Sequence, residues 1–371
     1  MKRRIYLLSL ISIWSIMILA GCSQKVKLVS GSYSATGDSG INVFDFNLSD
    51  GLINSLSSFN AGPNPSYLCF SRISDLIYAI NEVDTFMNVR AGGLTTIKYD
   101  GAFRNLRKVN EIAVPNGSPC YISLNPQNDF ILIANYGGGS VAVVRLDGSG
   151  IPVAVTDTVH FRADNGSISH AHKVAFDPTG QRVYVTDLGL DRIWIFTLDR
   201  SSGKLISLIA DGINLPKGTG PRHFVFNEAG TSLYVIGELN STITVLNVDK
   251  DKGLVPVQTV STLSKGFAGE NSCADIHIDR SGKHLYGSNR GENTIVTYNI
   301  DASGLLTLGG HSDCGGIWPR NFSIDPSGKF MLVANQRSGN IAVFKIDQRS
   351  GIPSQKIQDI KVKAPVCLKF K

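Results

Sequence analysis

The amino-acid sequence predicts an all-β fold, a seven-bladed β-propeller closed by pairing its first and last strands. Residues 169–199 contain three short segments in which apolar and polar residues alternate, separated by turns rich in Gly, Pro and Asp. This pattern is typical of half-buried antiparallel strands. It recurs in six units, which begin at Pro65, Pro119, Ala171, Pro221, Cys273 and Pro319. A spacing of roughly 50 residues between units is typical of propeller blades.

Each unit is expected to form one four-stranded blade, with an innermost strand A followed outward by strands B, C and D. Before the first full unit lie only the later strands of a blade, in VKLVSGSY and in residues 40–47. The missing innermost strand is predicted at residues 365–370. Pairing the two termini in one sheet closes the ring and removes an exposed edge. A single domain follows, because an isolated blade cannot bury both of its faces.

The N-terminal segment has the features of an export signal. A basic MKRR precedes an apolar run over residues 5–19, which is short for a membrane span and ends at Cys22. The segment resembles a bacterial lipoprotein signal, which implies a signal peptide at 1–21, a lipidated tether at 22–27 and a propeller at 28–371. The protein would then be exported to the bacterial cell envelope and held by a lipid without spanning the membrane. The alternative is an ordinary secretory signal that happens to contain Cys.

Charge and cysteine content exclude several partners. The formal net charge is +6, but without Lys2, Arg3 and Arg4 the chain holds 33 basic and 30 acidic residues. No basic run with interleaved aromatic residues remains, so we expect no nucleic-acid partner. Apart from Cys22 there are five cysteines and no CxxC motif, so neither a metal site nor a disulfide pairing can be assigned. We expect a monomer.

The repeat places several charged side chains at one mouth of the central channel. The start of strand A and the end of strand B lie at the same edge of a blade. Alignment of the units brings together His172, Arg222, Arg320, Glu238 and Arg290. Equivalent positions of the repeats thus carry different charged residues at this mouth, which is typical of a functional site. A solvent-exposed channel mouth without a function would also be polar. Beside them lie Asn135, Tyr136 and His170, which we expect with Arg320 to contact a substrate.

Other assignments for these side chains are possible. The column of Asn135 also contains Asn81, Asn289 and Asn335, and such residues serve turns and contacts between blades. His170 and His172 are two residues apart and could form a metal pair with Asp187, but the nearby arginines disfavour a cation. His223 is expected on the opposite side of its strand from Arg222.

Several motifs carry a resemblance to a known family. They are SHAHKVAFDPTG, GPRHFVFNEAG with GELNSTI, ADIHIDRSGKHLYGSNRGENTI and WPRNFSIDPSGKFMLVANQ. From about Val29 to Phe370 the chain resembles the seven-bladed lactonases, which include propeller-type bacterial 6-phosphogluconolactonases and fungal carboxymuconate lactonising enzymes. The chain departs from the family's pattern at Ser169, where Pro is usual, and at Tyr121, where His is common. Both departures concern the edge of the pocket and therefore the choice of substrate.

The resemblance implies a cofactor-free catalytic site of His172, Arg222, Glu238 and Arg290. Opening a lactone needs an activated water and stabilisation of the carbonyl oxygen. Glu238 would activate the water and His172 would protonate the ring oxygen, or the two roles are exchanged. Arg222 and Arg290 would hold the oxyanion and the substrate's phosphate or carboxylate, and Arg320 would add to this anion binding.

The export signal and the family's namesake substrate disagree. A phosphorylated sugar lactone is a cytoplasmic metabolite, so an exported enzyme would meet a different lactone. Two alternatives to lactone hydrolysis stay open. One is the reversible lactonisation of a carboxylated muconate by the same four residues. The other is a surface-anchored propeller that binds a ligand without turnover.

Overall fold

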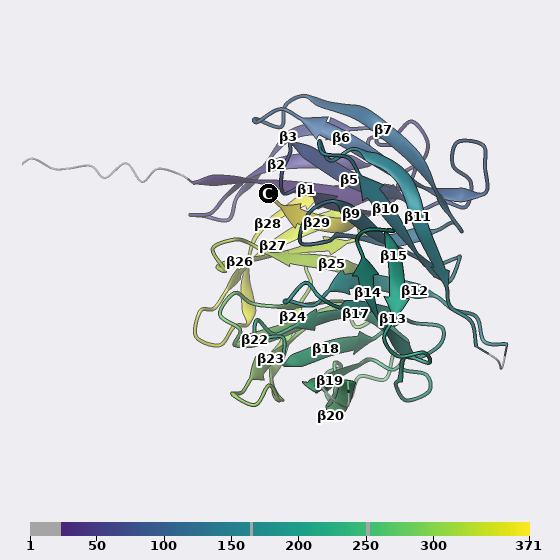
Figure 1. Cartoon of the computed structure of the whole chain (residues 1–371). Coiled ribbons are helices and arrows are strands. Elements are labelled where there is room, and N and C mark those ends of the chain that lie inside the picture. The colour runs from purple at the N-terminus through teal and green to yellow at the C-terminus, as the bar shows by residue number, and fades with distance from the viewer. Residues whose placement is uncertain (1–23, 164–165, 250–252) are drawn as a thin grey trace, which may run out of the picture.

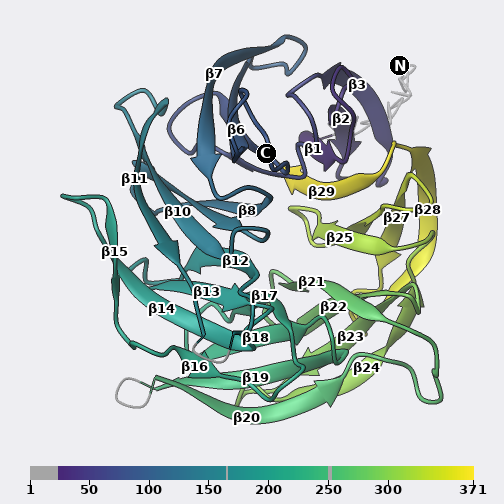
Figure 2. The ribbon, with the colours of Figure 1, turned by 90° about the vertical axis from the view of Figure 1, so that its right-hand side faces the viewer.

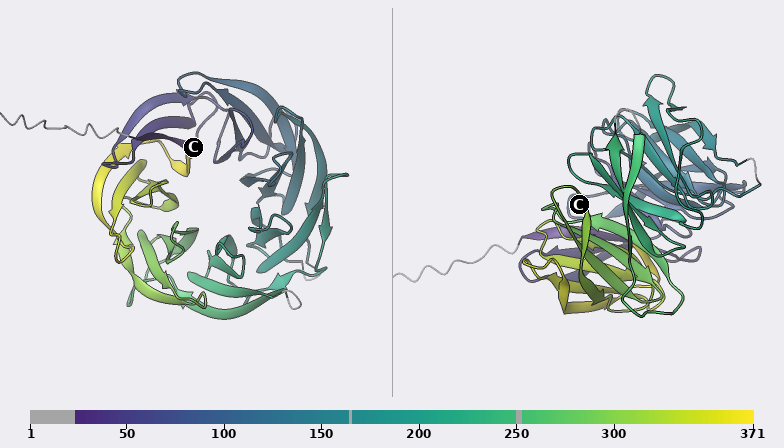
Figure 3. Two further views of the ribbon diagram at one scale, coloured as in Figure 1. Left: turned by 60° about the vertical axis from the view of Figure 1, so that its left-hand side comes forward. Right: turned by 90° about the horizontal axis from the view of Figure 1, so that it is seen from below.

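The computed structural model describes residues 24–163, 166–249 and 253–371, and these form an all-β propeller of seven blades. The blades stand around a central axis (Figures 2 and 3). The predicted fold class is therefore confirmed. The predicted signal peptide and Cys22 lie outside the described residues. Within those residues, no helix is long and apolar enough to cross a membrane.

Each blade is an antiparallel sheet whose strands follow the predicted order from the channel outward. The innermost strands are β4 (Tyr67–Phe70), β8 (Pro119–Leu124), β12 (Ala171–Phe176), β17 (Pro221–Phe226), β21 (Ser272–Ile278), β25 (Pro319–Ile324) and β29 (Pro365–Phe370). The second strands are β5 (Leu76–Asn81), β9 (Phe130–Asn135), β13 (Val183–Asp187), β18 (Ser232–Gly237), β22 (His284–Arg290), β26 (Phe330–Asn335) and β1 (Lys25–Ser32).

The outer half of each blade completes the sheet. The third strands are β6 (Ala91–Tyr99), β10 (Ser140–Leu146), β14 (Arg192–Asp199), β19 (Thr242–Asp249), β23 (Thr294–Ile300), β27 (Asn340–Ile346) and β2 (Ile41–Asn47). The outermost strands are β7 (Leu106–Pro115), β11 (Pro152–His160), β15 (Lys204–Ser207), β20 (Gly253–Ser261), β24 (Leu306–Asp313), β28 (Pro353–Lys361) and β3 (Ile53–Phe59). A short β16 (Ile213–Asn214) also pairs with β14.

The ring is closed by the two ends of the chain. β29 pairs with β1 in antiparallel register, with Leu28 opposite Phe370, and Figure 2 shows β29 beside β1 on the inner side of their blade. β1 begins at Lys25, which pairs with Asn47 of β2. The expected tether at 22–27 is therefore too long and the boundary at 28 is corrected, because the strand extends to match the full length of β2.

Neighbouring blades are joined by a repeated tyrosine contact. The buried hydroxyl of Tyr78 on β5 donates a hydrogen bond to the carbonyl of Gly150, which lies in a turn of the next blade. Tyr234 and Tyr286 make the same contact with Gly304 and Gly351. The three glycines have φ angles of 86°, 83° and 72°. This left-handed conformation favours glycine.

Most innermost strands begin with a β-bulge that points one extra residue at the channel. In β12, Ala171 pairs with Asp187 and Lys173 pairs with Thr186, so His172 has no partner in the ladder. Arg222 in β17 and Arg320 in β25 occupy the same place. A bulge bends its strand and re-aims a side chain, and bulges are common beside active sites.

The closing strand should be as important for stability as any other innermost strand. Leu368 of β29 is buried, with 1% of its surface exposed, whereas Leu308 of β24 is 54% exposed. We predict that Leu368→Ala lowers the free energy of unfolding by about 2–5 kcal/mol, because it leaves a cavity between packed blades. Leu308→Ala is the matched control and should change little. Urea denaturation measures both, and equal stability of the two variants would contradict closure through β29.

Candidate active site

One mouth of the channel contains a charged cavity of about 230 Å³. Its lining residues are Glu82, Cys120, Tyr136, His172, Arg222, Glu238, Arg290 and Arg320. The histidine and two of the arginines come from strand-A bulges, and Arg290 is the last residue of a second strand. The structure thus brings together all five residues that the alignment of the repeats placed at this mouth.

Glu238 binds two buried arginines at once. Its Oε2 lies 2.7 Å from Nε of Arg222 and 2.8 Å from Nη2 of Arg290. Arg222 also donates to the carbonyl of Ala274, and Arg290 donates to the carbonyls of Ser272 and Cys273. Both guanidinium groups are therefore fixed in place. Each carries five N–H donors, more than these contacts use, so both can still donate to a molecule in the cavity.

The arginines determine the charge of Glu238. Burial alone would raise the pKa of this carboxyl, but the charges of Arg222, Arg290 and Arg320 outweigh burial and hold the pKa below its ordinary value. Burial, followed by repulsion from Arg222, lowers the pKa of Arg290 to about 9. At neutral pH Glu238 is therefore a carboxylate that lies between two guanidinium groups. These groups repel each other, and the negative charge of Glu238 offsets the repulsion.

His172 is buried and neutral. Only 4% of its surface is exposed, and its Nδ1 has no hydrogen-bond partner. Its ring meets Tyr136 edge to face, with 5.8 Å between the centroids. Burial first, and then the positive charge of Arg222, lower the pKa of His172 well below its ordinary value. The ring is therefore in its neutral form at neutral pH, the form that a general base requires.

Glu238 and His172 differ in the contacts that hold them. Glu238 shares Oε2 between two cations, which hold its pKa below the ordinary value. His172 has an unpaired ring nitrogen and no carboxylate partner. Glu238 therefore orients the two arginines, whereas no carboxylate of the described residues holds the ring of His172.

A second group of side chains holds Arg320. Its Nη2 donates to the hydroxyl of Tyr33 at 2.8 Å, and that hydroxyl donates to Glu82 at 2.9 Å. The guanidinium lies over the Tyr33 ring, 5.2 Å from the centroid. The rest of its N–H groups remain available to the cavity. The repeat pattern indicates no role for Tyr33 or Glu82, although Glu82 occupies the same repeat column as Glu238 and Arg290.

Two of the expected substrate-contacting residues lie outside the cavity. Asn135 is fully buried, and its amide donates to the carbonyl of Pro115 and to Ser140. His170 stacks on Tyr136 with 4.4 Å between ring centroids, and its Nδ1 lies 3.0 Å from the Tyr136 carbonyl oxygen. We therefore correct both expectations. Asn135 anchors a connecting loop, as Asn81, Asn289 and Asn335 also do, and His170 supports Tyr136 from behind.

The metal alternative has no support in the geometry. Asp187 accepts hydrogen bonds from the hydroxyl of Ser169, the backbone N–H of His170 and the indole of Trp194. These contacts occupy the carboxylate that would complete a site with His170 and His172. Across residues 24–163, 166–249 and 253–371, no group of three or more His, Cys, Asp or Glu residues is arranged to hold a metal ion.

The expected position of His223 is wrong. Because Arg222 occupies the bulge, His223 also faces the channel, and its Nε2 lies 3.4 Å from Nη1 of Arg222. Its Nδ1 lies 2.7 Å from Asp275, which also binds His277. Asp275 and His223 thus form a buried pair directly beneath the arginine cluster. A bulge is not visible in an alternating sequence pattern, so this pair could not be foreseen.

The fold and the site together define a class: a seven-bladed propeller with a His, Glu and Arg cluster at one channel mouth. The chain belongs to the lactonase family of seven-bladed β-propellers, whose family model matches residues 27–370. It is 28% identical to the 6-phosphogluconolactonase of Bacillus subtilis, covering 92% of this chain and 97% of the relative. It is 33% identical to the 6-phosphogluconolactonase of Formosa agariphila, covering 84% and 90%.

A solved structure is similar over the same extent. The periplasmic gluconolactonase of Pseudomonas aeruginosa superposes with a TM-score of 0.86 and 28% identity, covering 94% of this chain and 99% of that one. The expected family is therefore confirmed.

The neutral state of His172 should appear in the pH dependence of stability. The unfolded chain binds a proton at a histidine near pH 6.5, whereas the folded chain does not, so stability falls as the pH drops below about 6.5. We predict that His172→Gln weakens this fall by up to about 1.4 kcal/mol per pH unit. Urea denaturation between pH 7 and 5 measures it. The exposed His160→Gln is the control, and identical slopes for the wild type and His172→Gln would contradict a neutral His172.

Proposed function

We propose that this protein is a lactone hydrolase that opens a sugar lactone at the mouth of its central channel. The observation that carries the proposal is the neutral ring of His172, which lines one cavity together with three guanidinium groups. One group can take a proton from water and the others can stabilise a negatively charged oxygen. Lactone hydrolysis needs both actions.

The reaction uses the side chains in sequence. His172 takes a proton from a water molecule as the water oxygen bonds to the lactone carbonyl carbon. Arg222 and Arg290 donate hydrogen bonds to the carbonyl oxygen as it becomes an oxyanion. The bond from this carbon to the ring oxygen then breaks, and protonated His172 returns its proton to that oxygen. The product is an open-chain hydroxy acid, which loses its acidic proton to the solvent.

The charge of the cavity suits a polar substrate rich in oxygen atoms. Three arginines face two carboxylates, Glu82 and Glu238, which leaves one net positive charge. The relatives from B. subtilis and F. agariphila are named 6-phosphogluconolactonases, and the P. aeruginosa protein is named a gluconolactonase. Sugar lactones are therefore the proposed class. Arg320 is the proposed contact for the sugar's outlying hydroxyl or phosphate, because it has the most uncommitted donors.

The proposed place of action is outside the cytoplasm. The basic start, the apolar run and Cys22 favour export and lipidation at Cys22, with the mature protein held in the cell envelope as a monomer. An exported enzyme would meet an unphosphorylated sugar lactone. Mass spectrometry of the mature N-terminus tests this, and a chain that retains residues 1–21 or carries no lipid at Cys22 would contradict it.

Removal of the proposed base should abolish most of the turnover. We predict that His172→Gln lowers kcat for gluconolactone by about 10²–10⁴-fold, because general-base catalysis contributes about that much. Glu238→Gln should also lower kcat, because the arginines lose their shared anchor. The assay measures the rate of acid release above that of spontaneous hydrolysis. The protein used begins at residue 22 and carries the substitution Cys22→Ser, so that it is not lipidated. An unimpaired His172→Gln variant would contradict the mechanism, and no acceleration by the wild type would favour a binding role.

Arg320 should discriminate between charged and uncharged lactones. We predict that Arg320→Gln lowers kcat/KM for 6-phosphogluconolactone by at least about tenfold more than for gluconolactone, since a charge-assisted hydrogen bond to an anion is about twice as strong as a neutral one. Arg337→Gln is the matched control, because Arg337 is exposed at the same mouth but does not line the cavity. Equal losses for both substrates would contradict this role of Arg320.

A further inference from the structure

We propose that the face of the disc opposite the active site is a docking surface for an anionic membrane, so that the channel mouth opens away from the lipid. We call it the basal face. It consists of the turns at 71–75, 279–283, 325–329 and 347–351, together with the start of β1 and the end of β29. The inference rests on the proposed lipid anchor at Cys22, but not on the proposed lactonase activity.

The strand register puts the N-terminal end of the propeller on the basal face. Leu28 of β1 pairs with Phe370, and the N–H of Lys371 donates to the carbonyl of Lys27. The start of β1 thus lies beside the end of β29, as Figure 1 also shows. The other end of β1 reaches the active site, because Tyr33, the next residue, contacts Arg320. β1 therefore crosses the disc from the basal face to the catalytic mouth.

The chain between β1 and Cys22 is too short to reach the other face. β1 has 8 residues, and a strand rises about 3.3 Å per residue, so it spans about 26 Å. Cys22 lies three residues before Lys25, a distance of at most about 11 Å even when fully extended. A lipid on Cys22 that enters a bilayer therefore draws the basal face to the membrane surface.

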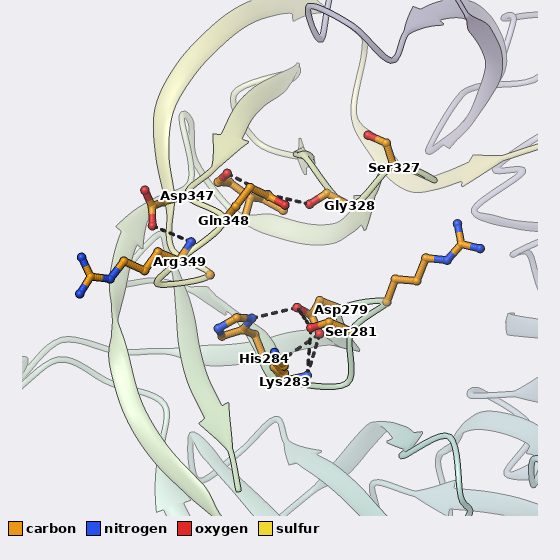
Figure 4. A pocket seen from close by; sticks show the side chains of 12 residues that line it. Asp279, Ser281, Lys283, His284, Ser327, Gly328, Asp347, Gln348 and Arg349 are labelled. Carbon is orange, nitrogen blue, oxygen red and sulfur yellow. Dashed lines mark hydrogen bonds and ion pairs between the residues drawn. The ribbon is translucent and has the colours of Figure 1, made fainter.

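The basal face carries three exposed cations that lie in no ion pair with the described residues. Exposed Arg280, Lys283 and Arg349 surround a hollow of about 460 Å³ (Figure 4). The carboxylates in the same hollow are engaged locally. Asp279 binds His284 and the N–H of Lys283, and Asp347 accepts from the N–H groups of its own turn. In Figure 4 the side chain of Arg349 extends away from these contacts.

A second hollow on this face, of about 500 Å³, is lined mostly by apolar side chains, with Asp177 as its one carboxylate. Arg72 and Lys369 line it, and exposed Lys371 ends the chain nearby. Within the described residues, none of these cations lies in an ion pair: Arg72 and Lys371 donate to backbone carbonyls, and Lys369 donates to Tyr67. Ile73, at the tip of the turn beside them, is 61% exposed. Basic groups around an apolar tip suit a bilayer with anionic headgroups.

The alternative orientation is one in which the catalytic mouth faces the membrane. Exposed apolar side chains also occur on loops around the catalytic mouth, namely Met87, Ile168, Leu239 and Ile317. With the anchor at Cys22, those loops could meet the same membrane only if the first residues of β1 left the sheet. That would break pairs such as Lys25 with Asn47.

The test places a fluorescent label on either face of the full-length chain. Ser281→Cys marks the basal face, and Ala268→Cys, also exposed, marks a loop at the catalytic mouth. The chains are produced in bacteria, purified from membranes and placed on phosphatidylglycerol vesicles whose headgroups carry a quencher. We expect the label at 281 to be quenched several-fold more than the label at 268. Equal quenching, the reverse order, or a chain recovered in soluble form without lipid would overturn the proposal.

A charge-matched pair of variants tests the surface itself. Arg280→Gln/Lys283→Gln/Arg349→Gln should lower the fraction of chain bound to phosphatidylglycerol vesicles several-fold and reduce its salt dependence. The control removes the same charge from exposed positions at the catalytic mouth, through Arg162→Gln/Lys265→Gln/Arg337→Gln. It should change neither the bound fraction nor its salt dependence. Equal effects would overturn the basal face as the docking surface. Lactone hydrolysis by each variant is measured in parallel, so a failure of the lactonase proposal is recognised separately.

Discussion

Three guanidinium groups converge on one end of the central channel, and their mutual repulsion is the constraint on which the site depends. Arg222 and Arg290 are each at most 4% exposed, so water cannot screen them well and a carboxylate must. Glu238 forms ion pairs with both. Arg320 instead donates to the hydroxyl of Tyr33, which donates to Glu82. The same positive field keeps His172 neutral. One electrostatic arrangement thus fixes the hydrogen-bond donors and keeps the histidine beside them uncharged.

The propeller meets this constraint through two devices of its backbone. Bulges at the starts of the innermost strands turn His172, Arg222 and Arg320 toward the same mouth. The closure of the ring then delivers Tyr33, the residue after β1, to Arg320. The strand that completes the fold therefore also completes the site. β1 begins on the opposite face of the disc, so it connects that face to the mouth where the arginines converge.

The sequence was sufficient for the fold and for most of the cavity, because each blade repeats the same strand pattern and equivalent positions must share one edge. The cluster of His172, Arg222 and Glu238 follows from that register. The directions of the surrounding side chains cannot be predicted from the register. His223 was placed on the wrong side of its strand, because a bulge adds a residue without disturbing the alternation of apolar positions. The contact of Tyr33 with Arg320 joins residues 287 positions apart and depends on the three-dimensional closure.

The most direct test of the central claim is a crystal structure with gluconate, the open-chain product of gluconolactone. The account predicts that the product carboxylate lies between Arg222 and Arg290, with a ring nitrogen of His172 within hydrogen-bonding distance of the product. Gluconate bound with its carboxylate away from both arginines, or bound outside this cavity, would contradict the assignment of the channel mouth as the site of lactone opening.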